Sequence, residues 1–352
     1  MKGKLANMRH WISTLVLALL VGSAPATAAP IQDGHNHGAE EIHATDAQKR
    51  SFEYSPEVLQ AWAKIPIQEG GRIKPLDTFA GFQLLRFNGK RGINVKGLAP
   101  EEKLTPVAWL LDCIFFPEQA RDYPCMIVNL KDVAVAVGLN LDSKKKRDRY
   151  SYNELVAVRS ALMNKANEAN GKDPKTRNAV DRQLLTLSRN FLELEDLFRV
   201  TRFGDFPLPT SDIPALAGLF TGGDPELPQF LGRSAEIKMA AGGEGGTANP
   251  TDGAKWTNLF GYLSELQFRN YSGLAIFPPT ATPELQPEWL AWPEMIQSCL
   301  AGDKDALDNV PALEALAAAY HSRQDGSAFT PAAVAFAGMV RDRAVQRGEY
   351  ER

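Results

Sequence analysis

The sequence predicts a mainly α-helical fold, α+β at most, for the body of this chain. Residues 151–201 contain two long segments whose apolar side chains recur at helical spacing, separated by the helix-breaking Gly171-Lys172-Asp173-Pro174. The best strand candidate, by contrast, is the short apolar run over 126–130. With 352 residues, 44% of them hydrophobic and 23% charged, the chain can bury an ample core. We therefore expect a helical domain with extended loops rich in proline and glycine.

The central region gives the clearest helices. Ser151 and Glu154 have the Ser-x-x-Glu spacing of a capping box, which predicts a helix that begins there and ends near Ala169. A longer helix is predicted over 176–201. Its apolar residues alternate in steps of four and three, the spacing of a packed helix pair, at Val180, Leu184, Leu187, Phe191, Leu194 and Phe198. The two segments are predicted to form a long antiparallel helical hairpin.

Residues 65–80, called the Gly-Gly segment below, combine a turn with a helix start. Gly70-Gly71 predicts a tight turn, because glycine adopts positive φ without a steric cost. Asp77 is expected to cap a helix over 78–87. The side chains expected to face the core from that helix are Phe79, Phe82 and either Leu84 or Leu85.

The remaining helices are predicted from their start signals. Ser55 before Pro56 is typical of an N-cap followed by a first helical turn. Thr105 predicts the same start for a helix that ends near residue 117. Other helices are expected over 131–138, 256–268, 289–300, 311–321 and 330–348, the last with Thr330 as its N-cap.

The N-terminus has the pattern of an export signal. Basic residues precede the apolar stretch 11–21, and Ala26-Thr27-Ala28 supplies small residues for cleavage. This predicts a signal peptide over 1–28 and a periplasmic or otherwise extracytoplasmic body. The alternative is that the apolar stretch stays as an N-terminal membrane anchor, although it is shorter than the roughly 20 residues of a membrane span.

The rest of the chain is predicted to be one domain behind a linker. Residues 29–54 are polar and without periodicity, as expected of a flexible, histidine-containing linker. An extracytoplasmic helical domain is predicted over 55–352. The region 204–253, rich in proline and glycine, marks a candidate sub-boundary within it.

Cysteines and histidines are the candidates for a disulfide or a metal site. In an oxidising compartment thiols tend to pair, and the short loop between Cys113 and Cys125 makes them the candidate bridge. Three buried, inert thiols are the alternative. His35 and His37, with His43 nearby, form a weak transition-metal candidate, against the alternative of a solvated linker.

No catalytic constellation is evident in the sequence. His321, the one histidine of the predicted domain, has no nucleophile or acid at motif spacing, and no phosphate-binding loop is present. A net charge of −3 gives no reason to expect a nucleic-acid partner. The basic run 144–147 is either a solvated loop or a contact for an anionic membrane. The prediction is a non-enzymatic protein without an intrinsic cofactor.

The charged residues of the Gly-Gly segment are the candidate binding residues. In the architectural interpretation the glycines make the turn, Pro75 fixes the approach and Asp77 caps the helix. The alternative is that Arg72 and Lys74 bind a carboxylate or a protein partner, since a guanidinium can bind a carboxylate through two hydrogen bonds. Arg72, Lys74 and Asp77 are therefore the candidate ligand- or partner-binding residues.

Several segments together resemble one known family. The Gly-Gly segment resembles a "PVQ-x-GGR-x-KPLDT-x-A" motif, and the WLLD segment, residues 108–118, resembles "WLLD-x-x-F-x-PE". Asp122-Tyr123-Pro124 follows in the same order, and then the RYS segment, residues 149–155, which resembles "RYS-x-x-EL". These are motifs of the large extracytoplasmic domain of system II cytochrome c biogenesis proteins, the cytochrome c synthetase family.

The resemblance implies a role in assembly. It implies an exported accessory component of cytochrome c maturation that scaffolds the handling of haem and apocytochrome c. Family members continue into a multispan membrane region, so the resemblance predicts a separate multispan haem-handling subunit as partner, or a truncated relative. Haem then belongs to the complex, and a haem propionate is the carboxylate implied for Arg72 and Lys74. The alternative is an extracytoplasmic ligand-binding or interaction module unrelated to haem.

Overall fold

The computed structural model describes residues 43–142, 144–145, 147–201, 207–241, 253–269, 274–278 and 289–347. The chain divides into residues 1–38 and one compact unit, residues 39–352, to which every described residue belongs. Helices dominate the described part, and its strands form two-stranded sheets, so the prediction of a mainly α fold is confirmed. No helix in these ranges is long and apolar enough to cross a membrane. The predicted signal peptide, residues 1–28, lies outside the described residues.

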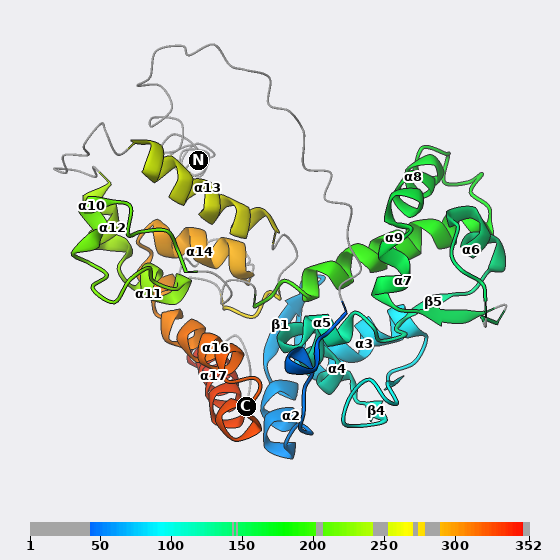
Figure 1. Cartoon of the computed structure of the whole chain (residues 1–352), viewed down its shortest axis with the longest axis horizontal. Coiled ribbons are helices and arrows are strands. Elements are labelled where there is room, and N and C mark those ends of the chain that lie inside the picture. Colours follow the sequence, from blue (N-terminus) through cyan, green and yellow to red (C-terminus); the bar gives the residue numbers. More distant parts are fainter. Residues whose placement is uncertain are drawn as a thin grey trace, which may run out of the picture. The chain divides into compact units, whose positions relative to one another are not determined.

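Figure 1 shows the elements in chain order. The part through residue 201 contains η1 (Asp46–Gln48), α2 (Pro56–Ala63), β1 (Pro66–Glu69), β2 (Arg72–Pro75), α3 (Leu76–Asn88), β3 (Ile93–Asn94), β4 (Lys103–Leu104), α4 (Pro106–Phe115), α5 (Pro117–Ala120), β5 (Met126–Val128), α6 (Lys131–Val137), β6 (Asp148–Tyr150), α7 (Tyr152–Val156), α8 (Arg159–Asn170) and α9 (Ala179–Leu197). The later part contains α10 (Pro214–Ala217), α11 (Leu227–Gly232), α12 (Ser234–Ala240), α13 (Gly253–Arg269), α14 (Trp292–Leu300), α15 (Lys304–Leu307), α16 (Val310–His321) and α17 (Gly326–Gln346).

The folded body begins earlier than predicted. Ser55 caps α2 as expected, since its hydroxyl accepts a hydrogen bond from a backbone N–H of the first turn at 3.3 Å. Residues 43–54, however, are not a free linker, because Tyr54 is buried and Phe52 packs edge-to-face on Phe116. The predicted linker therefore ends too late, and its last part is taken up by the core.

The Gly-Gly segment forms a β-hairpin. β1 and β2 pair antiparallel with Glu69 opposite Arg72, and the two glycines between them have φ of 58° and 75°. Two positive φ values in a two-residue loop strongly favour glycine. The sequence predicts this turn but not its strands. The second edge of β1 is also occupied, because Gln68 donates its backbone N–H to the carbonyl of Ala275 at 3.0 Å.

Two helices begin before their predicted start. α3 begins at Leu76 with Pro75 as its N-cap, so Asp77 lies in the first turn rather than at the cap. Its negative charge there still interacts favourably with the helix dipole. α17 is capped by the side chain of Asp325, which makes the predicted N-cap, Thr330, an internal residue. In both cases the helix extends past the polar residue that marked its start in the sequence.

One of the three core positions predicted for α3 is wrong. Phe79 and Leu84 are buried as expected, whereas Phe82 is 49% exposed and Leu85 is 39% exposed. α3 packs on α2, on α4 and on the hairpin. Phe82 and Leu85 are three residues apart, so they share the helix face that these neighbours leave open.

α4 is surrounded by other elements. Thr105 caps it as predicted, through a hydrogen bond from the backbone N–H of Ala108 at 3.3 Å. Every residue from 107 to 115 is buried. Trp109 packs edge-to-face on Phe87 of α3, with ring centroids 5.9 Å apart. A helix that is apolar on all sides needs neighbours on all sides, and α2, α3, α5 and α9 pack on it.

The region from β5 to α9 follows the prediction with one break. β5 pairs antiparallel with β6, and α6 ends at Gly138, whose φ of 79° is a left-handed C-cap. Ser151 and Glu154 form the predicted capping box. The helix that they start ends at Val156, and α8 follows after a short break. α8 and α9 then pack on each other, in agreement with the predicted hairpin.

The C-terminal helices return to the first part of the chain. α16 and α17, orange to red in Figure 1, pack on each other, and α17 packs on α2, drawn in blue. Trp62 donates its indole N–H to the carbonyl of Ala333 at 3.0 Å, and Phe329 packs edge-to-face on Phe115. Both sides of the expected sub-boundary at 204–253 therefore contribute to one compact unit.

Candidate interaction surface

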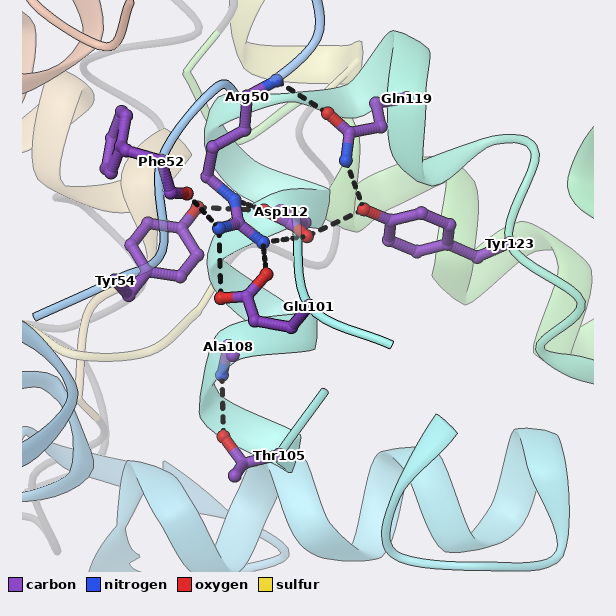
Figure 2. A network of polar contacts seen from close by, with 9 residues as sticks. All are labelled: Arg50, Phe52, Tyr54, Glu101, Thr105, Ala108, Asp112, Gln119 and Tyr123. Atoms are coloured by element: carbon purple, nitrogen blue, oxygen red, sulfur yellow. Dashed lines mark hydrogen bonds and ion pairs between the residues drawn. The ribbon is translucent and has the colours of Figure 1, made fainter. Parts of the chain in front are cut away.

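A buried polar cluster joins the chain before α2 to α4 (Figure 2). Its centre is the pair of Arg50 with Asp112, in which the guanidinium donates to both carboxylate oxygens, with Nε–Oδ1 at 2.8 Å and Nη2–Oδ2 at 3.2 Å. The same guanidinium donates to both oxygens of Glu101, at 3.0 Å from Nη1 and 2.6 Å from Nη2. One cation therefore joins two carboxylates through charge-assisted hydrogen bonds.

Two tyrosines and a glutamine complete this cluster. Tyr54 and Tyr123 donate their hydroxyls to Asp112 at 2.9 and 2.7 Å. Gln119 donates to the Tyr123 hydroxyl at 2.6 Å and accepts from the backbone N–H of Arg50 at 2.7 Å. Burial raises the pKa of Asp112, an effect opposed first by the charge of Arg50 and then by the hydrogen bonds. Burial also raises the pKa of both tyrosines, which stay protonated donors.

The role of this cluster is structural. The side chains of Arg50 and Asp112 are fully buried, and that of Glu101 is 20% exposed. Each guanidinium nitrogen of Arg50 has an acceptor, and each carboxylate oxygen of Asp112 accepts from two donors. Buried charges persist when they are paired and hydrogen-bonded in this way. The cluster thus holds residues 43–54 on the body.

The family-like segments also have structural roles in the same core. Asp112 and the buried Trp109 belong to the WLLD segment. Arg149 of the RYS segment donates from Nη2 to the carbonyl of Asn88 at 2.9 Å, which satisfies an acceptor in the last turn of α3. Most charged side chains of the WLLD and RYS segments therefore form hydrogen bonds or ion pairs within the fold.

The Gly-Gly segment is different, because some of its charged side chains are exposed to solvent. Arg72 is exposed on β2, and no carboxylate of a described residue pairs with it. Lys74 is half-buried and forms an ion pair with Glu69 across the hairpin. Asp77 is exposed in the first turn of α3. Of the three candidate binding residues, Arg72 and Asp77 are thus fully at the surface.

An exposed aromatic ring connects Lys74 to a further cation. The ammonium of Lys74 lies 6.0 Å from the ring centroid of Phe82, and the guanidinium of Arg91 lies 4.7 Å from it. Leu85 lies about one turn further along the same face of α3. The result is an apolar centre with two cations near it.

Two basic segments that are far apart in the sequence meet at the end of α3. Lys90 and Arg91 follow its C-cap, Gly89, and Nη2 of Arg147 lies 3.8 Å from the position of a Cβ on that glycine. Lys90, Arg91, Lys145 and Arg147 are exposed. In the described part of the chain no carboxylate forms an ion pair with Lys90, Arg91 or Arg147, and the charge of Lys145 acts on Asp148. The name basic face is used below for the surface formed by Arg72, Lys74, Phe82, Leu85, Lys90, Arg91, Lys145 and Arg147.

His43, a predicted weak metal residue, has polar partners on the body. Its Nδ1 lies 2.9 Å from a carboxylate oxygen of Asp122, and Asn153 donates to the same oxygen at 2.7 Å. His35 and His37 lie outside the described residues. Over the described ranges, no group of three or more His, Cys, Asp and Glu side chains is placed to hold a metal ion.

The cysteines are free thiols. Cys113, Cys125 and Cys299 are each buried and unbridged, so the predicted Cys113–Cys125 disulfide is not formed. Burial raises the pKa of Cys113 well above its usual value and that of Cys125 to about 12. Thiols that stay protonated are poor nucleophiles. The alternative of three buried, inert thiols describes this structure.

Comparison with known proteins gives no matching family model, no matching curated protein and no matching solved structure. The chemistry of the basic face therefore follows from its own residues. Guanidinium and ammonium groups bind carboxylates and phosphates, and an exposed ring beside them adds apolar contact area. This combination suits a negatively charged partner that also has an apolar part.

Sequence reasoning identified part of the basic face. The sequence singled out Arg72 and Lys74 as candidate binding residues. For the run 144–147 it left two alternatives, a solvated loop and a membrane contact. Phe82 is missed because any phenylalanine in an amphipathic helix is assigned to the core. The signal that could have identified it is that Phe79, Leu84 and their helical neighbours already form a complete apolar stripe, from which Phe82 is offset.

Proposed function

We propose that this chain is an exported accessory component of cytochrome c maturation that acts by binding other components. Its proposed partners are a multispan membrane subunit that handles haem, and apocytochrome c. The support is the resemblance of the Gly-Gly, WLLD and RYS segments to system II cytochrome c biogenesis proteins. The observation that carries the proposal is the exposure of Arg72 on the Gly-Gly segment, two residues before Lys74 on the same strand.

The residues of the family-like segments differ in whether the fold needs their side chains, and this difference supports a binding role. Asp112, Arg149 and Ser151 hold the fold together through buried or capping hydrogen bonds. Arg72 has no such task. The hairpin that presents it is fixed by α3 on one side and by the strand-like contact with residues 274–278 on the other. Because the backbone that carries Arg72 is already ordered, binding of a partner would cost the conformational entropy of its side chain but not that of the hairpin.

The chemistry of a haem contact can be divided between this chain and its partner. A guanidinium such as that of Arg72 binds a carboxylate group like a haem propionate bidentately. The two described histidines, however, are engaged by carboxylates: His43 by Asp122 at 2.9 Å and His321 by Glu226 at 2.8 Å. In this proposal the axial ligands of the haem iron come from the membrane subunit.

Deletion of the gene tests the proposed role. We expect c-type cytochromes to be lost and to return when the wild-type gene is supplied. A gene carrying Arg72→Glu and Lys74→Glu should fail to restore them, whereas Lys238→Glu with Lys304→Glu, the same charge change at exposed positions on α12 and α15, should restore them. Normal levels of c-type cytochromes in the deletion strain would contradict the proposal.

Two binding measurements separate haem contact from scaffolding. Titration of the purified chain with haem, followed in the Soret band, reports direct binding, and Arg72→Glu should weaken it. Capture from detergent-solubilised membranes should recover a multispan haem protein whether or not haem binds directly. Failure of both measurements would leave the interaction module unrelated to haem as the remaining function.

A further inference from the structure

We propose that the basic face binds the surface of an anionic phospholipid membrane. This inference does not depend on the proposed role in cytochrome c maturation, since it uses only the charge, exposure and contacts of the face. It goes beyond the Gly-Gly segment, because residues from the end of α3 and from the loop before β6 take part.

The cations of the face come from three segments that the fold holds together. Lys74 and Arg91 both contact the ring of Phe82, which connects the hairpin to the chain after α3. Arg147 lies against Gly89 and so beside Lys90. The RYS segment strengthens this junction, because the side chain of Arg149 binds the carbonyl of Asn88 at the end of α3. The backbone segments that carry these charges are therefore held in place by the core.

The fold makes no use of most of these charges. Arg72, Lys90 and Arg147 are exposed and form no ion pair with a carboxylate among the residues that the structure describes, whereas the backbone N–H of Lys145 and then its charge help to lower the pKa of Asp148. The guanidinium of Arg91 contacts an aromatic ring instead of an acid. The chain as a whole carries a net charge of −3. The basic face is thus a local reversal of charge on an acidic protein, which favours attachment in one orientation.

Phe82 and Leu85 give this face an apolar centre. Proteins that attach to a membrane surface place apolar side chains in the headgroup region while lysine and arginine stay at the level of the phosphates. Phe82, with the cations of Lys74 and Arg91 near its ring, has this arrangement. Transfer of an exposed phenylalanine side chain from water into a lipid interface lowers its free energy.

A lipid surface fits the spread of these cations better than an acidic peptide does. The charges are distributed over the hairpin, the end of α3 and the loop before β6, and the carboxylate beside Arg147, that of Asp148, already accepts hydrogen bonds from the backbone N–H groups of Lys145 and Arg149. An anionic membrane presents negative charge over a wide area, so it can attract all the basic residues of the face at the same time. The attraction grows with each added basic residue. A peptide would contact only a few of them at a time.

Vesicle co-sedimentation tests the inference with the full chain. Vesicles of phosphatidylcholine alone measure whatever residues 1–28 contribute, and vesicles of phosphatidylcholine with phosphatidylglycerol measure the added effect of anionic lipid. The face variant is Arg72→Glu with Arg91→Glu and Arg147→Glu. The control variant makes the same charge change at exposed positions on other helices, with Lys238→Glu, Lys304→Glu and Arg341→Glu. Circular dichroism establishes that both variants are folded.

We expect the wild type and the control variant to bind anionic vesicles similarly at low salt, and the face variant to bind about a hundred-fold more weakly, from the contribution of each basic residue near an anionic surface. High salt should remove most of the difference, because it screens exposed charges. Phe82→Ser should weaken binding at both salt concentrations, whereas Met339→Ser, another exposed apolar residue, should not.

Three outcomes would overturn the inference. The first is equal binding of the wild type to both kinds of vesicle. The second is an equal loss in the control variant, which would mean that net charge alone governs the attachment. The third is that the face variant binds vesicles normally but no longer captures an acidic protein from solubilised membranes, in which case the face binds protein.

Discussion

Two contacts between an arginine and an aromatic ring have opposite consequences in this protein. The guanidinium of Arg50 lies 4.3 Å from the ring centroid of Tyr54, and that of Arg91 lies 4.7 Å from that of Phe82. Arg50 is buried and bound to Asp112, whereas Arg91 is exposed and, as far as the structure is described, has no carboxylate. Burial makes pairing obligatory, while exposure leaves the charge available to a partner.

The largest effect is expected from breaking the buried pair. Asp112→Ala should lower the free energy of unfolding by about 3–5 kcal/mol, because it removes the fully buried carboxylate that Arg50, Tyr54 and Tyr123 share and leaves the guanidinium with the carboxylate of Glu101 alone. Equilibrium unfolding in urea measures this. Glu101→Ala, at the partly exposed edge of the cluster, should cost less, since water can reach that side of the guanidinium. A loss below about 1 kcal/mol for Asp112→Ala would show that the cluster is not needed for stability.

The same contrast can be tested within α3. Phe87 is fully buried against Trp109, and Phe82 is half exposed on the opposite face. Phe87→Ala should lower the free energy of unfolding by about 3–5 kcal/mol because it leaves a cavity. Phe82→Ala should change it by no more than about 0.5 kcal/mol. If the two variants are equally unstable in thermal unfolding, Phe82 belongs to the core after all.

A smaller difference is expected between two family-like residues. Ser151 caps α7, and its replacement by Ala removes a hydrogen bond to the first turn. This should cost about 1 kcal/mol of unfolding free energy. Arg72→Ala, on the exposed hairpin, should stay within about 0.5 kcal/mol of the wild type. Urea midpoints of the two variants give the comparison, and a larger effect for Arg72→Ala would mean that the hairpin needs this cation.

The smallest effect concerns a half-buried carboxylate, which lies between the two extremes. Burial alone would raise the pKa of Asp224, but hydrogen bonds from Ser211 and Thr210 outweigh it and the pKa is lowered. The stabilisation from Asp224 is therefore present above the pKa of an unfolded aspartate, about 3.9, and is lost as pH falls through the lower folded value. Asp224→Asn should remove this part of the acid dependence in stability curves measured below pH about 4. If the stability of Asp224→Asn below pH about 4 changes with pH as that of the wild type does, the proposed contribution of Asp224 is wrong.

Prediction from the sequence succeeded where the signal was local. The helix starts at Ser55 and Thr105, the capping box at Ser151 and the glycine end of α6 were all confirmed. Each depends on backbone hydrogen bonds between residues a few positions apart. The break between α7 and α8 was missed, because no proline or glycine marks it in the sequence.

Prediction was weaker for the candidate surface. The sequence singled out Arg72, but it placed Phe82 in the core and had no means to bring Arg91 to that ring. Helical periodicity tells which residues share a face, but not which face other elements cover. The burial of Arg50 and Tyr54 was missed for a related reason, since the partner of Arg50 is 62 residues away in the chain.

By itself, the sequence determined the helical class of this protein and the glycine turn that carries Arg72, because periodicity and φ preferences act over a few residues. Only the tertiary structure decided that Arg50 is neutralised inside the core while Arg91 remains outside it. That choice depends on contacts between distant segments, which set how much water and which opposite charge each arginine has around it.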